Sequence, residues 1–199
     1  MNLLVLPNEI LDLIVQNIES CDDYCSFRSV NKRIKSVCNI TLKQRKWQRY
    51  YELKENKPNC FHFTTYLCKN GDLEMLKWIL KNTTEVCTTD AMDYAALNGQ
   101  LEVVKWLHEN RTEGCTENAM DWAAKYGHLE VVKWLHENRK EGCTEKAMDW
   151  AANNGHLEVV KWLHENRTEG CTYLAMNWAA SNGHLEVVKW LQENKKNSI

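Results

Sequence analysis

Glycine, proline and an excess of charge of one sign are all scarce in this sequence of 199 residues. It has 8 Gly and 2 Pro, and its 25 Lys and Arg nearly balance its 27 Asp and Glu. The balanced charge provides no general attraction to nucleic acid or to an anionic membrane surface. With 44% hydrophobic residues, the chain has enough apolar side chains for a packed core, which argues against a disordered protein.

Long apolar runs are also missing. The longest ones near the N-terminus, residues 3–6 and 10–18, are interrupted by polar residues, and no basic residue precedes Arg28. Neither a signal peptide nor a membrane span fits this pattern, so we expect an intracellular location, in the cytoplasm. The 9 Cys are then expected to be reduced thiols, and an odd number cannot pair completely.

The few glycines are regularly spaced. All of them fall on two series with a step of 28 residues: Gly71, Gly99, Gly127, Gly155 and Gly183, and then Gly114, Gly142 and Gly170. A tryptophan, a cysteine and a methionine recur with the same step. This periodicity predicts a domain of about five repeats over residues 60–199. The expected units are 60–86, 87–114, 115–142, 143–170 and 171–199.

Each unit has the pattern of two helices. In the unit 115–142, Thr116 is placed to cap a first helix, whose Ala and Met side chains recur at helical spacing. Gly127 is placed to end that helix in the left-handed conformation. A second helix is predicted from about His128 to Asn138, with Leu, Val and Trp on its apolar face. Because no segment alternates as a strand would, the expected fold class is all-α.

The sequence A-A-x-x-G-H-L-E-V-V-K-W-L occurs at residues 123–135, 151–163 and 179–191 and resembles the core of the ankyrin repeat. It departs from that family in two ways. The usual T-P-L-H stretch reads N-A-M-D at residues 118–121, and the period is 28 rather than 33 residues. The missing residues lie where ankyrin repeats carry a projecting β-turn. The resemblance therefore implies an α-solenoid of five ankyrin-like helix pairs with short loops and few or no finger hairpins.

The first fifty residues form a different pattern. Residues 1–59 contain no Gly and carry 10 Lys and Arg against 7 Asp and Glu, whereas residues 60–199 carry 15 against 20. Three amphipathic segments are predicted as short helices, and the first begins at Pro7 with apolar residues at offsets of three and four. We expect a separate domain over 1–50 and a linker over 51–59.

The motifs of this N-terminal segment resemble an F-box. It has L-P-x-E-I-L at residues 6–11, an acidic turn at 22–23, F-R-S-V-N-K-R-I at 27–34, and Trp47. It differs from the family by one extra residue before Val30 and by an Ile at position 34, where Trp is usual. F-boxes dock on the Skp-type adaptor of SCF ubiquitin ligases. By matching position, the resemblance implies an adaptor-binding surface made of Leu6, Pro7, Glu9, Ile10, Ile14, Phe27 and Val30. The alternative is that these residues only close a small local core.

The recurring His and Cys do not predict a metal site or a disulfide. Equivalent positions in stacked helical units should lie about 10 Å apart. Zinc needs ligands at about 2 Å, and a disulfide needs Cα atoms within about 7 Å. The Cys spacing in residues 21–38 matches no zinc motif, and the recurring outer-helix Trp is best explained as core packing. We expect no metal, no cofactor and no catalytic residues, so the protein is predicted not to be an enzyme.

Positions that differ between units are the candidates for binding specificity. They cluster at the start and the end of the first helix, the helix that lines the concave partner-binding surface of a repeat stack. Together with the residues between them, they make up the predicted target-binding set: Glu117, Asn118, Asp121, Trp122, Lys125, Tyr126, Glu145, Lys146, Asp149, Trp150, Asn153, Asn154, Tyr173, Leu174 and Trp178. Neutral drift at exposed positions would produce the same variation.

Two functions are consistent with these modules. The order of an F-box followed by repeats resembles the F-box and ankyrin proteins of large DNA viruses and protists. It implies a substrate-recruiting subunit that binds a Skp-type adaptor and captures an unknown target protein, without nucleic acid or membrane partners. The alternative is a non-enzymatic scaffold or competitive blocker that recruits no ligase. The two differ in what the apolar surface around Leu6 and Pro7 does.

Overall fold

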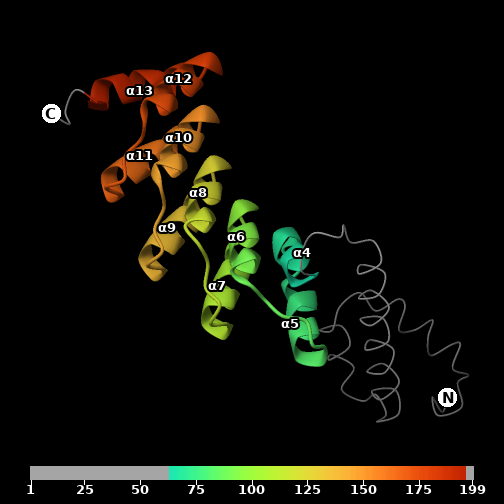
Figure 1. The fold of residues 1–199 in the computed structure, drawn as a ribbon. Coiled ribbons are helices and arrows are strands. Elements are labelled where there is room, and N and C mark those ends of the chain that lie inside the picture. Colours follow the sequence, from blue (N-terminus) through green and yellow to red (C-terminus); the bar gives the residue numbers. More distant parts are fainter. Residues whose placement is uncertain (1–62, 196–199) are drawn as a thin grey trace, which may run out of the picture. The chain divides into compact units, whose positions relative to one another are not determined.

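The repeat region is a stack of helix pairs. The computed structural model describes residues 63–195, which form ten helices in five consecutive pairs (Figure 1). The first helices of the pairs are α4 Phe63–Asn70, α6 Thr89–Leu97, α8 Asn118–Lys125, α10 Glu145–Asn153 and α12 Tyr173–Ser181. The second helices are α5 Leu73–Asn82, α7 Leu101–Asn110, α9 Leu129–Asn138, α11 Leu157–Asn166 and α13 Leu185–Lys195.

The pairs stack in chain order, as the repeat predicts. Each first helix contacts the first helix of the next pair and the second helix of its own pair (Figure 1). The second helices contact each other far less, so the first helices, called the inner helices from here on, lie on the more closely packed side of the stack. No strand occurs within residues 63–195, which confirms the expectation of an α-solenoid without finger hairpins in that range. The predicted helices of residues 1–50 and their docking residues lie outside the described residues.

Threonines and asparagines define the helix ends. The Thr144 hydroxyl accepts a hydrogen bond from the Lys146 amide and caps α10, and Thr172 caps α12 in the same way. Thr116 makes the same kind of bond, accepting from the Asn118 amide at 3.2 Å, but α8 begins one residue later than predicted and Glu117 stands at its N-cap position. At the other end, an asparagine at or next to the end of each second helix donates to the carbonyl of the tryptophan four residues earlier: Asn82, Asn110, Asn138, Asn166 and Asn194. These local bonds explain why each unit breaks at the same place.

The core consists of small residues on the inner helices and branched residues on the outer ones. Ala123 and Ala124 are fully buried, and Val132 is equally buried on the outer side. Small side chains allow the closer packing of the inner helices. The outer-helix tryptophans differ from expectation, because they are only half-buried. Trp134 instead packs against the edge of the His108 ring, with 5.2 Å between centroids.

The turn between the two helices of a pair requires glycine. Gly127 has φ +77°, and a Cβ added there would lie 2.7 Å from Nδ1 of His156 in the next unit. A left-handed conformation costs a non-glycine residue about 1–2 kcal/mol. Gly127→Ala should therefore destabilise the stack by that amount plus the cost of displacing His156.

Gly183 supplies the matched control for this prediction. It has the same φ of +77° but nothing within 4 Å of its added Cβ. Gly183→Ala should show only the backbone cost, so urea unfolding should find Gly127→Ala the more destabilised of the two. Equal losses would show that the contact with His156 contributes nothing.

Candidate functional site

A row of aromatic side chains runs along the inner helices. Tyr94, Trp122, Trp150 and Trp178 occupy the same position in four successive units, and each is half-buried. The rings of Tyr94 and Trp122 are 5.4 Å apart between centroids, so the row continues from one unit to the next. Half-buried aromatic rings provide contact area together with a polar edge, as in many protein interfaces.

Two lysines surround one ring of this row. The Lys125 ammonium nitrogen lies 5.2 Å from the centroid of Trp150 and 5.3 Å from that of Tyr126. The Lys146 nitrogen lies 5.8 Å from the same Trp150 centroid. All three distances are within the range of cation–π attraction. Lys125 ends α8 while Lys146 and Trp150 belong to α10, so this lysine–tryptophan cluster joins two units.

The aspartates of the inner helices have a different role from the one predicted. Asp121 is buried, and it accepts hydrogen bonds from the amide and the hydroxyl of Thr144 at 2.8 and 2.7 Å. Asp149 binds Thr172 in the same way. Both carboxylate oxygens are used within the stack. We therefore leave Asp121 and Asp149 out of the binding surface. Their hydrogen bonds to threonine join successive units.

This aspartate–threonine bond is absent at the first junction. Asp93 binds Thr116 as the later pairs do, but the position one repeat earlier is Thr65. The hydroxyls of Thr65 and Thr88 are buried, and neither has a hydrogen-bond partner in the structure. At the other end of the stack the equivalent residue is Asn177, which is exposed. The junctions between the later units are therefore held by a bond that the first one lacks.

The other predicted target-binding residues remain accessible. Exposed side chains are Glu117, Tyr126, Glu145, Lys146, Asn154 and Tyr173. Half-buried side chains are Asn118, Trp122, Lys125, Trp150, Asn153, Leu174 and Trp178. Asn154 also donates to the Lys125 carbonyl at 3.0 Å, so it fixes the junction beneath the lysine–tryptophan cluster. The stack brings the predicted positions of neighbouring units together on the inner helices, while their role in binding stays a prediction.

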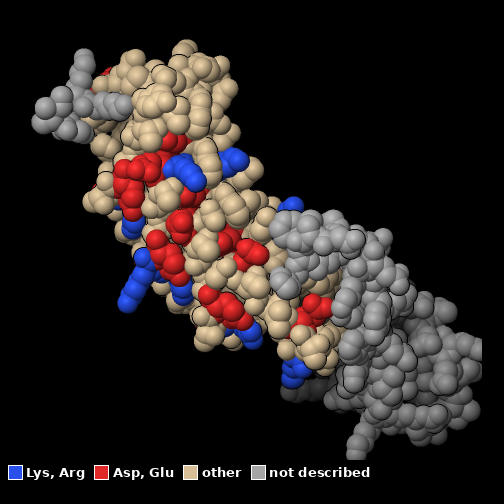
Figure 2. Space-filling view, viewed as in Figure 1, with Lys and Arg blue, Asp and Glu red and all other residues tan. Residues whose placement is uncertain are grey.

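Acidic side chains dominate the rest of the stack. Figure 2 shows them recurring from α5 to α11, with isolated basic side chains beside them. On α5, α7, α9 and α11 the recurring lysine pairs with the glutamate three residues before it, as Lys133 does with Glu130 at 3.1 Å. Exposed pairs of this kind contribute little to stability.

Burial perturbs the titration of groups at the turns and junctions. It lowers the pKa of His128 and His156, whose rings also hydrogen-bond to the carbonyls of Leu97 and Lys125. It raises the pKa of Asp93 to about 6, despite the two hydrogen bonds from Thr116. The histidines bind fewer protons in the folded than in the unfolded chain, so their contribution to stability falls as the pH drops through 6.5 and below. Asp93 acts in the opposite sense, because its contribution is lost as the pH rises through about 6.

The double variant His128→Gln, His156→Gln separates these effects. Gln100 occupies the same position in an earlier unit, so glutamine fits the site. Urea unfolding at about pH 7.5 and pH 5.5 should show that acid destabilises the variant less than the wild type. An identical pH dependence would show that the two histidines do not titrate with folding.

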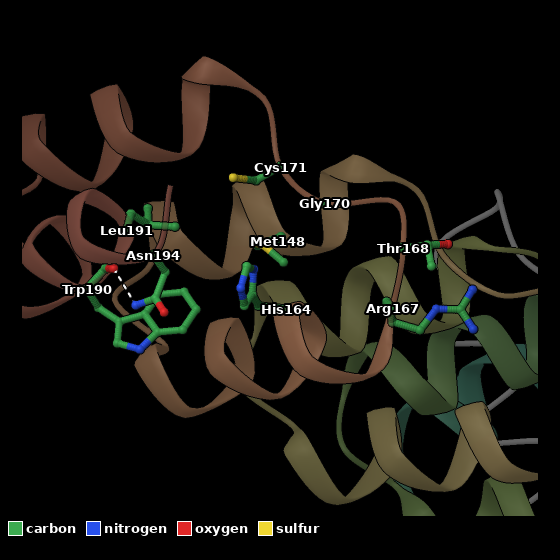
Figure 3. Close-up of a pocket in the computed structure, with 9 residues that line it drawn as sticks. All are labelled: Met148, His164, Arg167, Thr168, Gly170, Cys171, Trp190, Leu191 and Asn194. Atoms are coloured by element: carbon green, nitrogen blue, oxygen red, sulfur yellow. Dashed lines mark hydrogen bonds between the residues drawn. The ribbon is translucent and has the colours of Figure 1, made fainter. Parts of the chain in front are cut away.

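The outer side of the stack shows little that points to a catalytic or metal site. Figure 3 shows a pocket of about 310 Å³ between α11 and α13, with Met148, His164 and Trp190 among its lining residues. Among residues 63–195 no three His, Cys, Asp or Glu side chains are arranged to hold a metal ion. The Cys115 thiol is free and buried, and burial raises its pKa to about 12, as expected for an unreactive core residue.

Sequence analysis missed the aspartate–threonine bond and the lysine–tryptophan cluster. Asp and Thr each recur every 28 residues, and the aspartate always lies 23 residues before its threonine. That constant offset, together with the change to Asn177 in the last unit, was an available signal. The lysine–tryptophan cluster had no such signal, because Lys146 occurs once at its position in the repeat and the position of Lys125 is shared only with Lys69 of the first unit.

Comparison with known proteins agrees with this structure. The model of the family described as ankyrin repeats matches residues 64–147 and 120–199, and that of the F-box domain matches residues 3–44. The search of curated proteins returned no match. F-box domains generally bind Skp-type adaptors, ankyrin repeats generally bind protein targets, and both are typically non-enzymatic. None of the helices in residues 63–195 has the length and apolar character of a membrane span. The chain belongs to the ankyrin-repeat family and carries an F-box domain ahead of its repeats.

Proposed function

We propose that this protein recruits substrates to an SCF-type ubiquitin ligase. The observation that carries the proposal is the presence of both modules in one chain, an F-box domain at residues 3–44 and ankyrin repeats from residue 64 onward. One module binds the Skp-type adaptor, and the other holds a target protein for ubiquitin transfer. The transfer itself is catalysed by other subunits of the ligase.

Adaptor binding and target binding are assigned to different residues of the chain. Adaptor binding is assigned to the apolar positions that match the F-box motif, chiefly Leu6, Pro7 and Ile10. Target binding is assigned to the inner helices, where Trp122 and Trp150 are half-buried and flanked by exposed polar side chains. The open aromatic row supports this assignment, because partly exposed aromatic residues are enriched at protein interfaces.

A scaffold that recruits no ligase is the second candidate. It is favoured by the departures of the F-box segment from its family pattern, the extra residue before Val30 and the Ile at position 34. In that case residues 1–50 would serve only to cover the first unit of the repeats.

Binding of the purified full-length chain to a purified Skp-type adaptor distinguishes the two. We expect the proteins to co-elute as a complex in size-exclusion chromatography and to give a saturable isotherm in calorimetry. Absence of binding at micromolar concentrations of both proteins would contradict the ligase proposal and leave the scaffold.

A further inference from the structure

Lys125 and Lys146 contact aromatic rings, whereas most basic residues of the outer helices and loops form ion pairs. Seven of those residues pair with carboxylates: Lys77, Lys105, Lys133, Lys161, Arg111, Arg139 and Arg167. Within the described part of the chain, Lys125 and Lys146 have no carboxylate within 4 Å. Their contacts are with the Trp150 and Tyr126 rings, at 5.2 to 5.8 Å.

The two lysines occur at one junction only. The position of Lys146 is occupied in the other units by His62, Asp90, Asn118 and Leu174. The position of Lys125 is occupied by Lys69, Leu97, Asn153 and Ser181, so a lysine stands at both positions of a junction only here. Because Lys125 ends α8 and Lys146 is in the first turn of α10, both positive charges meet at a single ring of the aromatic row.

The surroundings leave these charges available to a partner. The aspartates of α8 and α10, Asp121 and Asp149, are buried and bound to threonines, as described above. The glutamates Glu117 and Glu145 are exposed at the N-terminal ends of α8 and α10, and each lies next in sequence to an inner-helix position that varies between units. The cluster is therefore a small basic and aromatic patch bordered by acidic residues.

We propose that Lys125, Lys146 and Trp150 bind an acidic segment of the target protein, one that places an Asp or Glu beside an apolar side chain. The inference rests on the proposed function, since it specifies the target of the same inner-helix face. A carboxylate of the target forms ion pairs with the two ammonium groups, while its apolar neighbour covers Trp150 and Tyr126. The cation–π contacts hold the lysine side chains in place before the target arrives, which reduces the entropy lost on binding.

Charge balance favours a short acidic peptide over nucleic acid. Residues 60–199 carry 15 Lys and Arg against 20 Asp and Glu, so a long polyanion would meet net repulsion along the stack. A short segment contacts only the patch. The acidic border at Glu117 and Glu145 further restricts where the negative charge of the partner can lie, which provides specificity.

Peptide selection with the full-length protein tests the proposal. A random peptide display library is selected on immobilised wild-type chain, and the affinity of recovered peptides is measured by fluorescence anisotropy. We expect enrichment of Asp and Glu over the unselected library and affinity that weakens with added salt. The variant Lys125→Glu, Lys146→Glu should bind these peptides at least about tenfold more weakly, because two ion pairs become repulsive.

The variant Lys133→Glu, Lys161→Glu is the matched control. It makes the same change of charge on the outer helices, where both lysines form exposed ion pairs. We expect it to bind the selected peptides within about twofold of wild type, because long-range charge effects are screened by salt. An equal loss in both variants would overturn the proposal by showing that only net charge matters.

Three other results would overturn the acidic-segment proposal. They are recovery of peptides without acidic enrichment, recovery of no peptide at all, and tighter binding of single-stranded oligothymidylate than of any selected peptide. Adaptor binding by the same samples is measured separately, so the ligase proposal succeeds or fails on its own. Non-acidic peptides whose binding is lost in Trp122→Ala would leave target capture by the inner helices standing and remove only its acidic preference.

Discussion

Replacing Asp121 by Ala is expected to lower the free energy of unfolding by about 3 kcal/mol. Asp121 is 1% exposed and accepts two hydrogen bonds from Thr144, one from the backbone amide and one from the hydroxyl. Alanine leaves both donors without their acceptor at the junction of two units, at about 1–3 kcal/mol for each unsatisfied group. Urea unfolding of the full-length chain, followed by circular dichroism, measures the loss.

Asn177→Ala is the matched control for this experiment. Asn177 occupies the position of Asp121 in the last unit, where it is exposed. Its removal should change the free energy of unfolding by no more than about 0.5 kcal/mol, as for most surface substitutions. Similar losses in the two variants would refute the role of the aspartate–threonine bond.

The conservative variant Asp121→Asn adds a graded result. Asparagine keeps one oxygen that accepts from the Thr144 amide, but its amide nitrogen cannot accept from the hydroxyl. The Thr144 hydroxyl also accepts from the Lys146 amide, so it has one lone pair left for the new donor and no acceptor for its own proton. We expect the free energy of unfolding of Asp121→Asn to lie between those of wild type and Asp121→Ala.

The helix pairs are predictable from the sequence because their determinants are local. The units from residue 115 onward each repeat a threonine before the first helix, an apolar face of Val and Leu on the second, and a glycine at the turn. Local rules place the second helix at His128–Asn138, and the structure has it at Leu129–Asn138 with His128 as its cap. The error is one residue because the glycine and the cap fix the turn between them.

The contacts between units are harder to predict because they depend on which residues the stacking brings together. An aspartate stands at the position of Asp121 in three units, which fits a residue of the stack as well as one of the surface, and we assigned it to the surface. Only its distance to Thr144 decides between the two. In the same way, a helical pattern alone places Trp134 in the core, whereas in the structure it is half-buried and contacts His108 of the preceding unit.

The candidate binding surface combines both kinds of information. Variation between units correctly identifies positions that the stack leaves accessible, such as Tyr126 and Lys146. It does not reveal that Lys125 and Lys146, which lie on different helices, meet at the Trp150 ring. Charge convergence of this kind requires the register between neighbouring units, which no single unit encodes.

Changing both Leu6 and Pro7 to Ala is expected to abolish adaptor binding, with a loss of at least about 100-fold in affinity. Each side chain removed from an apolar docking surface costs about 1.5 kcal/mol or more, and every 1.4 kcal/mol is a factor of ten. Calorimetry with the purified adaptor measures the loss. Leu185→Ala is a suitable control, since Leu185 is 72% exposed in the last unit and far along the sequence from the F-box. It should bind the adaptor as wild type does.

The melting temperature of the same double variant decides what residues 1–50 do for the repeats. A docking surface awaits a partner, so its truncation should leave the thermal unfolding of the repeats within a few degrees of wild type. A cover for the first unit would behave differently. The first junction already lacks the aspartate–threonine bond, because Thr65 stands where the later units have aspartate. Removing a cover from a first unit that already lacks this bond to its neighbour would lower the melting temperature strongly, and such a drop would overturn the docking assignment in favour of the scaffold.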